Sequence, residues 1–291
     1  MTLGLEIRDG AVAAILTGDG GAVQARDVQP GVGAASAVDA VRAVAHSGPA
    51  RIGIAVRDPF NPGSADIAAA AAGAAGSQNA PRLITRGTAV ALAEQWCGAA
   101  KGAEHVVALT AADCVHAGIV VGGRPFEGAH GLAGAAGWLA LNPVEREDYR
   151  KLGCLEAEIG ASGIVRRLVW RLKSGDRSGV LDMAGGDMAA ITVAQIFDAA
   201  RQGDGVAISV VRDTAKYIGM AIGNLVAVVD PDVVVLGGLI SDAADLLLEP
   251  SRLEARRRMP APVSSALRID AAALGDDGGA LGAARAAMLA P

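Results

Sequence analysis

Residues 205–238 read GVAISVVRDTAKYIGMAIGNLVAVVDPDVVVLGG and decide the fold class. Their first part, residues 205–230, predicts a long helix, and residues 232–238 form the most hydrophobic strand candidate of the chain. Residues 241–258 predict a further helix after that strand. A helix–strand–helix succession of this kind is typical of an α/β protein.

The two halves of the chain share one pattern. The first half opens with segments that predict strands, at residues 2–10, 12–20 and 22–29. Residues 36–48 predict a helix after them, with Ser36 as its N-cap. The second half repeats the theme with a strand pair at residues 105–111 and 117–123. The pattern predicts an α/β protein of two related lobes, in which ligands lie where strands end in glycine-rich turns.

Composition and charge narrow the class of function. The chain has 291 residues, 52% of them hydrophobic and 20% charged, which supports a substantial core. Abundant alanine and glycine predict tightly packed helices and strands, while 3% aromatic residues leave few platforms for nucleobases or sugar rings. The net charge of −5 argues against a nucleic acid partner, and the cationic run at residues 252–258 is interpreted as a solvated helix face.

The cysteines and the N-terminal residues indicate in which cellular compartment the protein is expected. Cys97, Cys114 and Cys154 are far apart and form no CxxC pair, so neither a disulfide framework nor a cysteine zinc site is indicated. The chain starts in a strand candidate without a signal sequence, and no uncharged apolar run reaches about 18 residues. We therefore expect a cytoplasmic protein without a membrane segment.

Four longer segments carry a family resemblance. They are residues 92–110, 122–138, 192–250 and 273–287. Together they resemble the ROK sugar kinases, which have the two-lobed actin-like ATPase (ribonuclease H-like) α/β fold. The resemblance implies a smaller lobe of residues 1–107 plus 280–291, a larger lobe of residues 108–279, and a homodimer. The DNA-binding repressors of that family carry a helix-turn-helix domain ahead of the first strand. This chain starts at the strand, so we expect no DNA binding.

The first phosphate-binding hairpin of the family has a pattern like D-x-G-G-T-K. Here Glu6 stands at the acid, and Arg8 and Asp9 stand at the glycine positions. Side chains at those positions obstruct the approach of a phosphate to the backbone, and the charge of Asp9 repels it. The alternative interpretation is that the sequence RDG is simply a good hairpin turn.

The second phosphate-binding hairpin of the family, a run like L-G-T-G-I-G-G-G, corresponds to TAADCVHAG, where only Gly118 remains. Asp113, Cys114 and His116 either form a new polar cluster or close a satisfied turn. Alternate positions on a strand share a face, so a Cys114–His116 nucleophile pair is a further alternative.

The catalytic base of the family is the Asp of an END-like segment that opens a helix. In this chain Thr85 takes the Asn position and Arg86 the Asp position. Arginine cannot accept a proton at physiological pH, so the resemblance predicts loss of sugar phosphorylation. Arg86 is instead expected to bind an anion or to be a surface residue at a strand end.

The sugar and zinc positions are altered as well. The family's A-G-E-I-G-H is AGAAGW here, with Ala135 for the sugar-binding Glu and Trp138 for the His that touches sugar and zinc. Of the zinc cysteines only Cys154 remains. Glu147 and Tyr149 stand at other cysteine positions, so no structural zinc is expected.

Some ligand-binding positions of the family keep polar or small residues. Glu156 matches a sugar-contacting Glu, Asn61 lies in what remains of the sugar loop, and His130 replaces an Asn. Gly237 and Gly238 stand where adenine or ribose rests against the backbone, although packing between a strand and a helix also explains them.

Three hypotheses about function remain. The first is a degenerate ROK homologue that has lost ATP-dependent phosphorylation and binds a small sugar-like or anionic ligand or a protein partner. The second is an enzyme of another reaction class on the same fold, acting on an anionic or sugar-derived molecule. The third is a divergent active sugar kinase. ATP and Mg²⁺ are disfavoured as cofactors. The candidate residues are Arg8, Asp9, Arg57, Asp58, Asn61, Arg86, His130 and Glu156 for ligand binding, Asp113, Cys114 and His116 for catalysis, and Gly237 and Gly238 for nucleotide binding.

Overall fold

The computed structural model describes residues 1–45 and 48–290. They form two compact units. Unit 1 comprises Met1–Ala108, Ala117–Gly134 and the chain from Ala272 onward, and unit 2 comprises Leu109–His116 and Ala135–Ala271. Residues 117–134 thus group with the N-terminal part of the chain, whereas the sequence-based boundaries assign them to the larger lobe.

Unit 1 is built on a mixed five-stranded sheet. Its main elements are β1 (Thr2–Ile7), β2 (Ala11–Thr17), β3 (Val23–Pro30), α1 (Ala34–Val44), β4 (Arg51–Val56), α2 (Pro62–Ala74), β5 (Arg82–Thr85), α3 (Arg86–Cys97) and α13 (Gly278–Leu289). The strand order is β3-β2-β1-β4-β5. The three N-terminal strands pair antiparallel, and β4 runs parallel to both β1 and β5. The hairpin-rich opening expected from the sequence is therefore confirmed.

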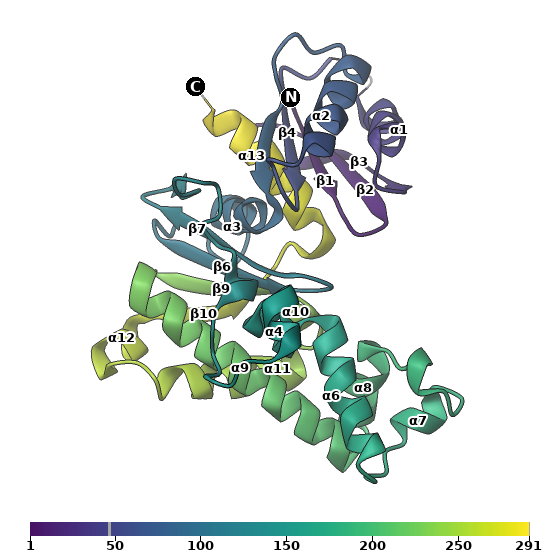
Figure 1. Ribbon diagram of the computed structural model, residues 1–291. Coiled ribbons are helices and arrows are strands. Elements are labelled where there is room, and N and C mark those ends of the chain that lie inside the picture. The colour runs from purple at the N-terminus through teal and green to yellow at the C-terminus, as the bar shows by residue number, and fades with distance from the viewer. Residues whose placement is uncertain (46–47, 291) are drawn as a thin grey trace. The chain divides into compact units, whose positions relative to one another are not determined.

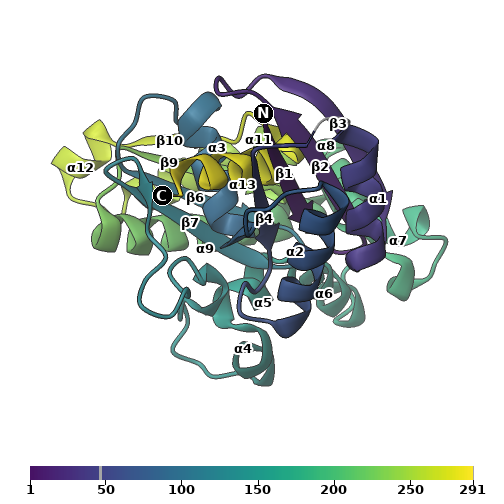
Figure 2. The same cartoon turned by 90° about the horizontal axis from the view of Figure 1, so that it is seen from above.

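Helices cover both faces of this sheet (Figure 1). α1 and α2 pack on one face, and α13 packs on the other with α3 beside it. The view from above shows the strands of the sheet between these helices (Figure 2). Since both faces are covered, β1 and β4 are buried along most of their length, as expected for parallel neighbours in the middle of a sheet.

Glycines let α13 approach the sheet and α3 at backbone distance. A Cβ atom at Gly53 of β4 would lie 1.8 Å from the carbonyl oxygen of Ala283, and a Cβ atom at Gly282 would lie 1.7 Å from that of Ala89. A larger residue at either position has to displace backbone, which a close-packed interior resists. The expectation of tight packing through small side chains is confirmed at these contacts.

A buried carboxylate fixes α3 in unit 1. Glu94 accepts hydrogen bonds from the backbone N–H groups of Ala99 (2.7 Å), Ala273 (3.0 Å) and Leu274 (3.0 Å). These donors compensate the carboxylate for its loss of water. The contact joins α3 to the segment that leads into α13, and it thereby positions the helix that begins at Arg86.

The second sheet also has five strands. They are β6 (Val106–Ala111), β7 (Val115–Val121), β8 (Arg124–Pro125), β9 (Val233–Gly238) and β10 (Arg268–Ala271). Their order is β10-β9-β6-β7-β8, with β9 and β10 parallel and β7 and β8 antiparallel. Strands combined with crossover helices confirm the α/β class.

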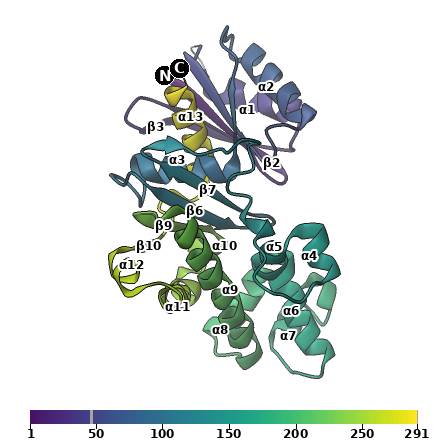
Figure 3. The ribbon, with the colours of Figure 1, turned by 60° about the vertical axis from the view of Figure 1, so that its left-hand side comes forward.

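Helices make up most of unit 2. They are α4 (Glu147–Leu152), α5 (Cys154–Ile159), α6 (Ala161–Lys173), α7 (Val180–Met183), α8 (Val193–Arg201), α9 (Gly205–Val229), α10 (Leu239–Asp242), α11 (Ala244–Arg256) and α12 (Ala261–Ala266). The 25-residue α9 packs against α5, α6, α8 and α11 (Figure 3). None of the described helices is long and apolar enough to span a bilayer.

The segment that decides the fold forms the expected elements, while two helix predictions need correction. The helix expected at residues 241–258 is interrupted at Ala243, whose backbone leaves the helical region between α10 and α11. The expected N-cap Ser36 is wrong because α1 already begins after Gly33; the Ser36 hydroxyl instead donates to the Pro30 carbonyl oxygen at 2.7 Å. Residues 46 and 47, which the expected helix includes, lie outside the described residues.

Candidate functional site

The first candidate site lies where β1 ends and α3 begins in unit 1. α3 starts at Arg86 because Thr85 caps it: the Thr85 hydroxyl oxygen accepts a hydrogen bond from the Thr88 N–H at 3.2 Å. Glu6 lies next to last in β1. The turn between β1 and β2 contributes Arg8 and Asp9.

Four charges meet at this site. Arg8 Nε donates to Glu6 Oε2 at 2.9 Å, and Arg86 Nε lies 3.4 Å from Glu6 Oε1. Arg86 Nη1 donates to Asp9 Oδ2 at 3.1 Å. Two carboxylates and two guanidinium groups therefore neutralise one another, and we call these residues the Glu6 cluster.

The position of Arg86 excludes one of its two sequence-based interpretations. Its side chain is only 12% exposed, so the interpretation as a surface residue at a strand end is wrong. Its Nε atom is buried and has no hydrogen-bond partner among the described residues. A guanidinium held by two carboxylates cannot accept a proton from a sugar hydroxyl, and it retains an unused donor.

Glycine at the start of α13 makes room for Glu6. A Cβ atom at Gly279 would lie 2.1 Å from Glu6 Cδ, so the carboxylate sits against the first turn of α13. The N-terminal end of a helix favours a carboxylate through its backbone dipoles. The Glu6 carboxylate is thus fixed by protein groups on two sides.

The turn between β1 and β2 uses its own backbone donors. The Arg8 N–H donates to the Ala11 carbonyl oxygen at 2.8 Å, and the Gly10 N–H donates to the Arg8 carbonyl oxygen at 3.0 Å. Gly10 has a φ of +109°, a conformation that favours glycine. These hydrogen bonds fit the interpretation of RDG as a hairpin turn, and they occupy amides that a phosphate cradle needs.

The hairpin between β6 and β7 is closed in a similar way. The Ala112 N–H donates to the Cys114 carbonyl oxygen at 3.0 Å, and the Ala112 carbonyl oxygen accepts from the Ala161 N–H at 2.9 Å. Cys114 is buried in the turn before β7, Asp113 is exposed, and His116 is half-buried in β7. The predicted Cys114–His116 pair required both residues to lie on one strand. Cys114 instead lies just before β7.

Glu156 anchors this second hairpin from α5. Its Oε2 atom accepts a hydrogen bond from the Val115 N–H at 3.0 Å. A Cβ atom at Gly137 would lie 3.0 Å from the same oxygen, so the segment around Gly137 packs closely on the carboxylate. Trp138 and Ala135, at altered sugar positions of the family, are both exposed.

A pocket of about 410 Å³ lies in unit 1 beside the capped end of α3. Its lining includes Thr85, Thr88 and Phe60, together with Gly128, Ala129 and Gly131. An ion pair between Arg82 and Glu127, 2.5 Å long, closes part of its wall. Hydroxyl groups, an aromatic ring and a charged pair suit a small hydroxylated molecule.

The remaining candidates of unit 1 lie in turns, close in sequence to residues that line this pocket. Asp58 accepts from the Phe60 N–H and Asn61 from the Gly63 N–H, each at 2.9 Å, so both side chains hold the turn that caps α2. Arg57 and His130 are exposed. The structure thus groups Arg8, Asp9 and Arg86 in one cluster and places Asp58 and Asn61 in another.

Sequence reasoning did not assign ligand-facing roles to the residues that line this pocket. Thr85 had a usable signal, because a threonine before a helical run predicts an N-cap. The pair of Arg82 and Glu127 had none, since the two residues are 45 positions apart.

The glycines at the end of β9 have a structural explanation. Gly238 has a φ of +64°, and a Cβ atom there would lie 2.2 Å from the Ala111 carbonyl oxygen. Gly237 is buried in the strand. Turn geometry and close packing account for Gly238, and nucleotide binding at this position stays a prediction.

The residues at the family's zinc position do not fit a metal. Cys154 is buried against Tyr149, Ala157 and Leu141. The Tyr149 hydroxyl donates to Glu158 Oε1 at 2.5 Å, and burial followed by this hydrogen bond raises the pKa of Tyr149 above its usual range. Across the described parts of the chain, no group of three or more His, Cys, Asp or Glu side chains is arranged to hold a metal ion.

Comparison with solved structures defines the fold. The chain is similar over 99% of its length to a ROK family glucokinase from Streptomyces griseus, solved with glucose and AMPPNP (TM-score 0.83, 24% identity, 99% of that chain). It is also similar over 99% of its length to the ROK hexokinase from Thermus thermophilus (TM-score 0.77, 27% identity, 98% of that chain). The fold is that of the actin-like ATPases, as the resemblance implied.

The family model of the ROK family matches residues 79–289, and the chain belongs to this family. It is 32% identical over 194 residues to a glucokinase from Halalkalibacterium halodurans, covering 66% of this chain and 58% of that protein. It is 32% identical over 197 residues to a glucokinase from Thermotoga maritima, covering 67% and 62%. The matched region thus spans less than two thirds of either relative.

Proposed function

We propose that this protein binds a small sugar-like molecule at the unit 1 pocket and does not phosphorylate it. The observation that carries the proposal is the Glu6 cluster. Arg86 takes the position of the family's catalytic Asp, and it is paired with Glu6 and Asp9. General-base catalysis needs a carboxylate within reach of the substrate hydroxyl, and both carboxylates here are held by guanidinium groups.

The two hairpins support the same proposal. Phosphoryl transfer depends on backbone amides and Mg²⁺ that hold the phosphates. The amides of Arg8, Gly10 and Ala112 donate to carbonyl oxygens of their own turns. Arg8 and Asp9 also add side chains where the family has glycines.

Phosphorylation of a sugar by a divergent site is the second candidate function. It is favoured by the relatives named glucokinase at 32% identity and by the hydroxyl groups of Thr85 and Thr88 at the pocket. Under this alternative, ATP and Mg²⁺ are cofactors and another group accepts the hydroxyl proton.

One experiment on the whole chain separates the two functions. Thermal unfolding is followed with glucose, mannose, N-acetylglucosamine and xylose, and release of ADP is measured with the same sugars plus ATP and Mg²⁺. Our proposal expects a higher Tm with at least one sugar, because a ligand of the folded state stabilises it by mass action. It expects no sugar-dependent ADP release. ADP release with a sugar contradicts the proposal and supports the second candidate, and a flat response in both assays contradicts both.

A matched pair of variants places the ligand. Phe60 and Phe126 are both exposed in unit 1, but only Phe60 lines the pocket. We expect Phe60→Ala to remove the sugar-dependent rise in Tm and Phe126→Ala to retain it. Equal responses of the two variants would place the sugar elsewhere.

The expected homodimer stays a prediction, and light scattering of the purified protein tests it.

A further inference from the structure

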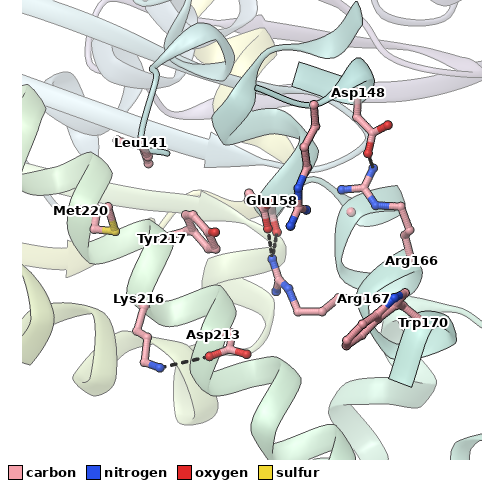
Figure 4. Close-up of a pocket in the computed structure, with 12 residues that line it drawn as sticks. Leu141, Asp148, Glu158, Arg166, Arg167, Trp170, Asp213, Lys216, Tyr217 and Met220 are labelled. Carbon is pink, nitrogen blue, oxygen red and sulfur yellow. Dashed lines mark hydrogen bonds and ion pairs between the residues drawn. The ribbon is translucent and has the colours of Figure 1, made fainter. Parts of the chain in front are cut away.

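A larger pocket lies within unit 2, formed by α4, α5, α6, α9 and the segment before α4. Its volume is about 760 Å³, within the range of small-molecule sites. Figure 4 shows Tyr217 and Trp170 on opposite sides of the opening, with Leu141 and Met220 on the side of Tyr217. None of the candidate residues from the sequence lines it.

The charged side chains of this pocket are almost fully matched. Each of its three carboxylates has a cation of its own. The pairs are Asp148 with Arg166 (2.5 Å), Glu158 with Arg167 (2.5 Å) and Asp213 with Lys216 (3.1 Å). Figure 4 shows Arg167 directed at Glu158 and Lys216 at Asp213.

Arg146 is the fourth cation of the pocket and has no carboxylate of its own. Among the described residues, its one ion pair is a 3.5 Å contact with Glu158 Oε1, which already accepts from the Tyr149 hydroxyl. The Tyr149 ring lies 5.5 Å from the Arg146 guanidinium carbon and orients the group. The lining therefore carries one positive charge in excess, on a guanidinium that is 54% exposed.

The back wall of the pocket is fixed by buried hydrogen bonds. Glu158 is only 5% exposed and is held by Tyr149 and Arg167. Arg167 also donates to the Glu158 carbonyl oxygen at 2.8 Å and to the Thr214 hydroxyl oxygen at 2.9 Å. Polar groups fixed in this way need little reordering when a ligand binds, which favours affinity.

We propose that this pocket binds a small organic anion, a phosphate or carboxylate group on a ring-sized body. Arg146 takes the charge through charge-assisted hydrogen bonds, and Trp170 and Tyr217 contact the ring. The site is separate from the proposed sugar pocket, which unit 1 forms by itself.

Within unit 2, Glu156 and Glu158 are two positions apart on α5 and therefore point to opposite sides of the helix. Glu156 contacts the β6–β7 hairpin, and Glu158 contacts this pocket.

Calorimetry on the full chain tests the proposal with four probes. Phenyl phosphate and glucose 6-phosphate carry both a charge and a ring, whereas inorganic phosphate lacks the ring and glucose lacks the charge. We expect saturable binding of at least one of the first two and clearly weaker binding of inorganic phosphate. The proposal is overturned if neither organic anion binds, or if inorganic phosphate binds as tightly as they do.

Two arginine variants assign the charge contact. Arg150 is 63% exposed on the neighbouring helix α4 and does not line the pocket, so it matches Arg146 in type and exposure. Arg146→Ala is expected to weaken binding about tenfold or more, as the loss of a charge-assisted hydrogen bond implies, and Arg150→Ala is expected to leave it unchanged. Equal weakening in both variants would mean a general charge effect and would contradict the site.

Tryptophan fluorescence gives an independent readout if Arg146→Ala fails to fold. Trp138 and Trp170 are both exposed in unit 2, and only Trp170 lines the pocket. The ligand-induced fluorescence change should persist in Trp138→Phe and vanish in Trp170→Phe. Binding that persists in Phe60→Ala shows that the anion does not use the unit 1 pocket. Loss of binding in Phe60→Ala contradicts the proposal.

Discussion

The two units each contain a carboxylate that lies between two arginines, and the two arrangements differ in how completely they are hydrogen-bonded. In the Glu6 cluster, Arg8 and Arg86 flank Glu6. In unit 2, Arg167 and Arg146 flank Glu158, and we call these residues with Tyr149 the Glu158 cluster. The resemblance to the family implies that the Glu6 cluster corresponds to its phosphate and base positions and that the Glu158 cluster lies beside its zinc position.

This difference predicts that the Glu158 carboxylate contributes more to stability than the Glu6 carboxylate does. Glu158 receives a tyrosine hydroxyl and a guanidinium, and Arg167 donates to two further oxygen atoms. In the Glu6 cluster, the buried Nε atom of Arg86 has no hydrogen-bond partner in the described chain, and Asp9 is partly exposed. A fully hydrogen-bonded buried network rigidifies a structure more than a network that contains an unsatisfied donor does.

The largest expected effect is that of Glu158→Ala. Removing this carboxylate leaves the Arg167 guanidinium, whose side chain is only 16% exposed, without its charge partner, which costs about 3–5 kcal/mol of unfolding free energy. Urea unfolding of the variant and the parent measures the loss. Glu147→Ala is the matched control, because its pair with Lys151 is highly exposed and such pairs contribute about 0–1 kcal/mol. A loss below that of the control pair would mean that the Glu158 cluster does not hold unit 2 together.

Arg86→Met should have a smaller effect on stability. Glu6 keeps Arg8 at 2.9 Å in this variant, so the carboxylate is not left alone, and we expect a loss of about 1–2 kcal/mol. Unfolding of Arg86→Met, Glu6→Gln and the double variant gives the coupling energy between the two side chains. A loss as large as that of Glu158→Ala would show that both clusters are structural and would remove the contrast between them.

Local pattern explains which parts of the fold could be predicted from the sequence. α9 and β9 were predicted within a residue or so, because a long apolar helix and an apolar β-branched run leave few alternatives. The N-cap of α1 was misplaced because the Ser36 hydroxyl is drawn to the Pro30 carbonyl oxygen, a contact that short-range rules do not contain. Element ends are decided by such single hydrogen bonds.

The candidate site could be predicted only where family motifs mark positions. The motif comparison identified Arg86 and Glu6, but not that they are paired, since 80 residues of chain separate them and no pattern links them. It singled out Tyr149 as a replaced cysteine without revealing its bond to Glu158. Glu158, Arg167 and Arg146 carry no motif at all, and the pairing of Glu158 with Arg167 depends on how the chain turns at Gly160 between α5 and α6.

The pH dependence of stability distinguishes the Glu158 cluster through Tyr149. Burial and the hydrogen bond to Glu158 raise the pKa of Tyr149 above the ordinary value of 10.0. A raised folded-state pKa contributes stability below the unfolded pKa, and this stability is lost as pH rises through and beyond 10.0. The contribution of Tyr149 to the slope approaches about 1.4 kcal/mol per pH unit.

Two phenylalanine variants isolate this contribution. The chain has 2 tyrosines, Tyr149 and Tyr217, so each can be replaced alone. Unfolding free energies are measured between about pH 9 and 11, the range around the ordinary tyrosine pKa. Tyr149→Phe should flatten the decline with pH, and Tyr217→Phe should retain it. An unchanged slope in Tyr149→Phe would mean that Glu158 does not hold the tyrosine in its neutral form.

The smallest expected effect is that of removing or adding a metal ion. The Glu158 cluster holds α4, α5 and α6 through hydrogen bonds and ion pairs, and Cys154 lies among apolar neighbours, so EDTA should leave the Tm unchanged. Added ZnCl₂ should not raise it either, because a single thiolate does not make a tetrahedral site. Cys154→Ala serves as the internal check, since it removes one buried side chain and should cost about 1 kcal/mol with or without EDTA. A drop in Tm with EDTA that disappears in Cys154→Ala would show that Cys154 binds a metal. The hydrogen bonds and ion pairs of the Glu158 cluster would then support a metal site instead of taking its structural place.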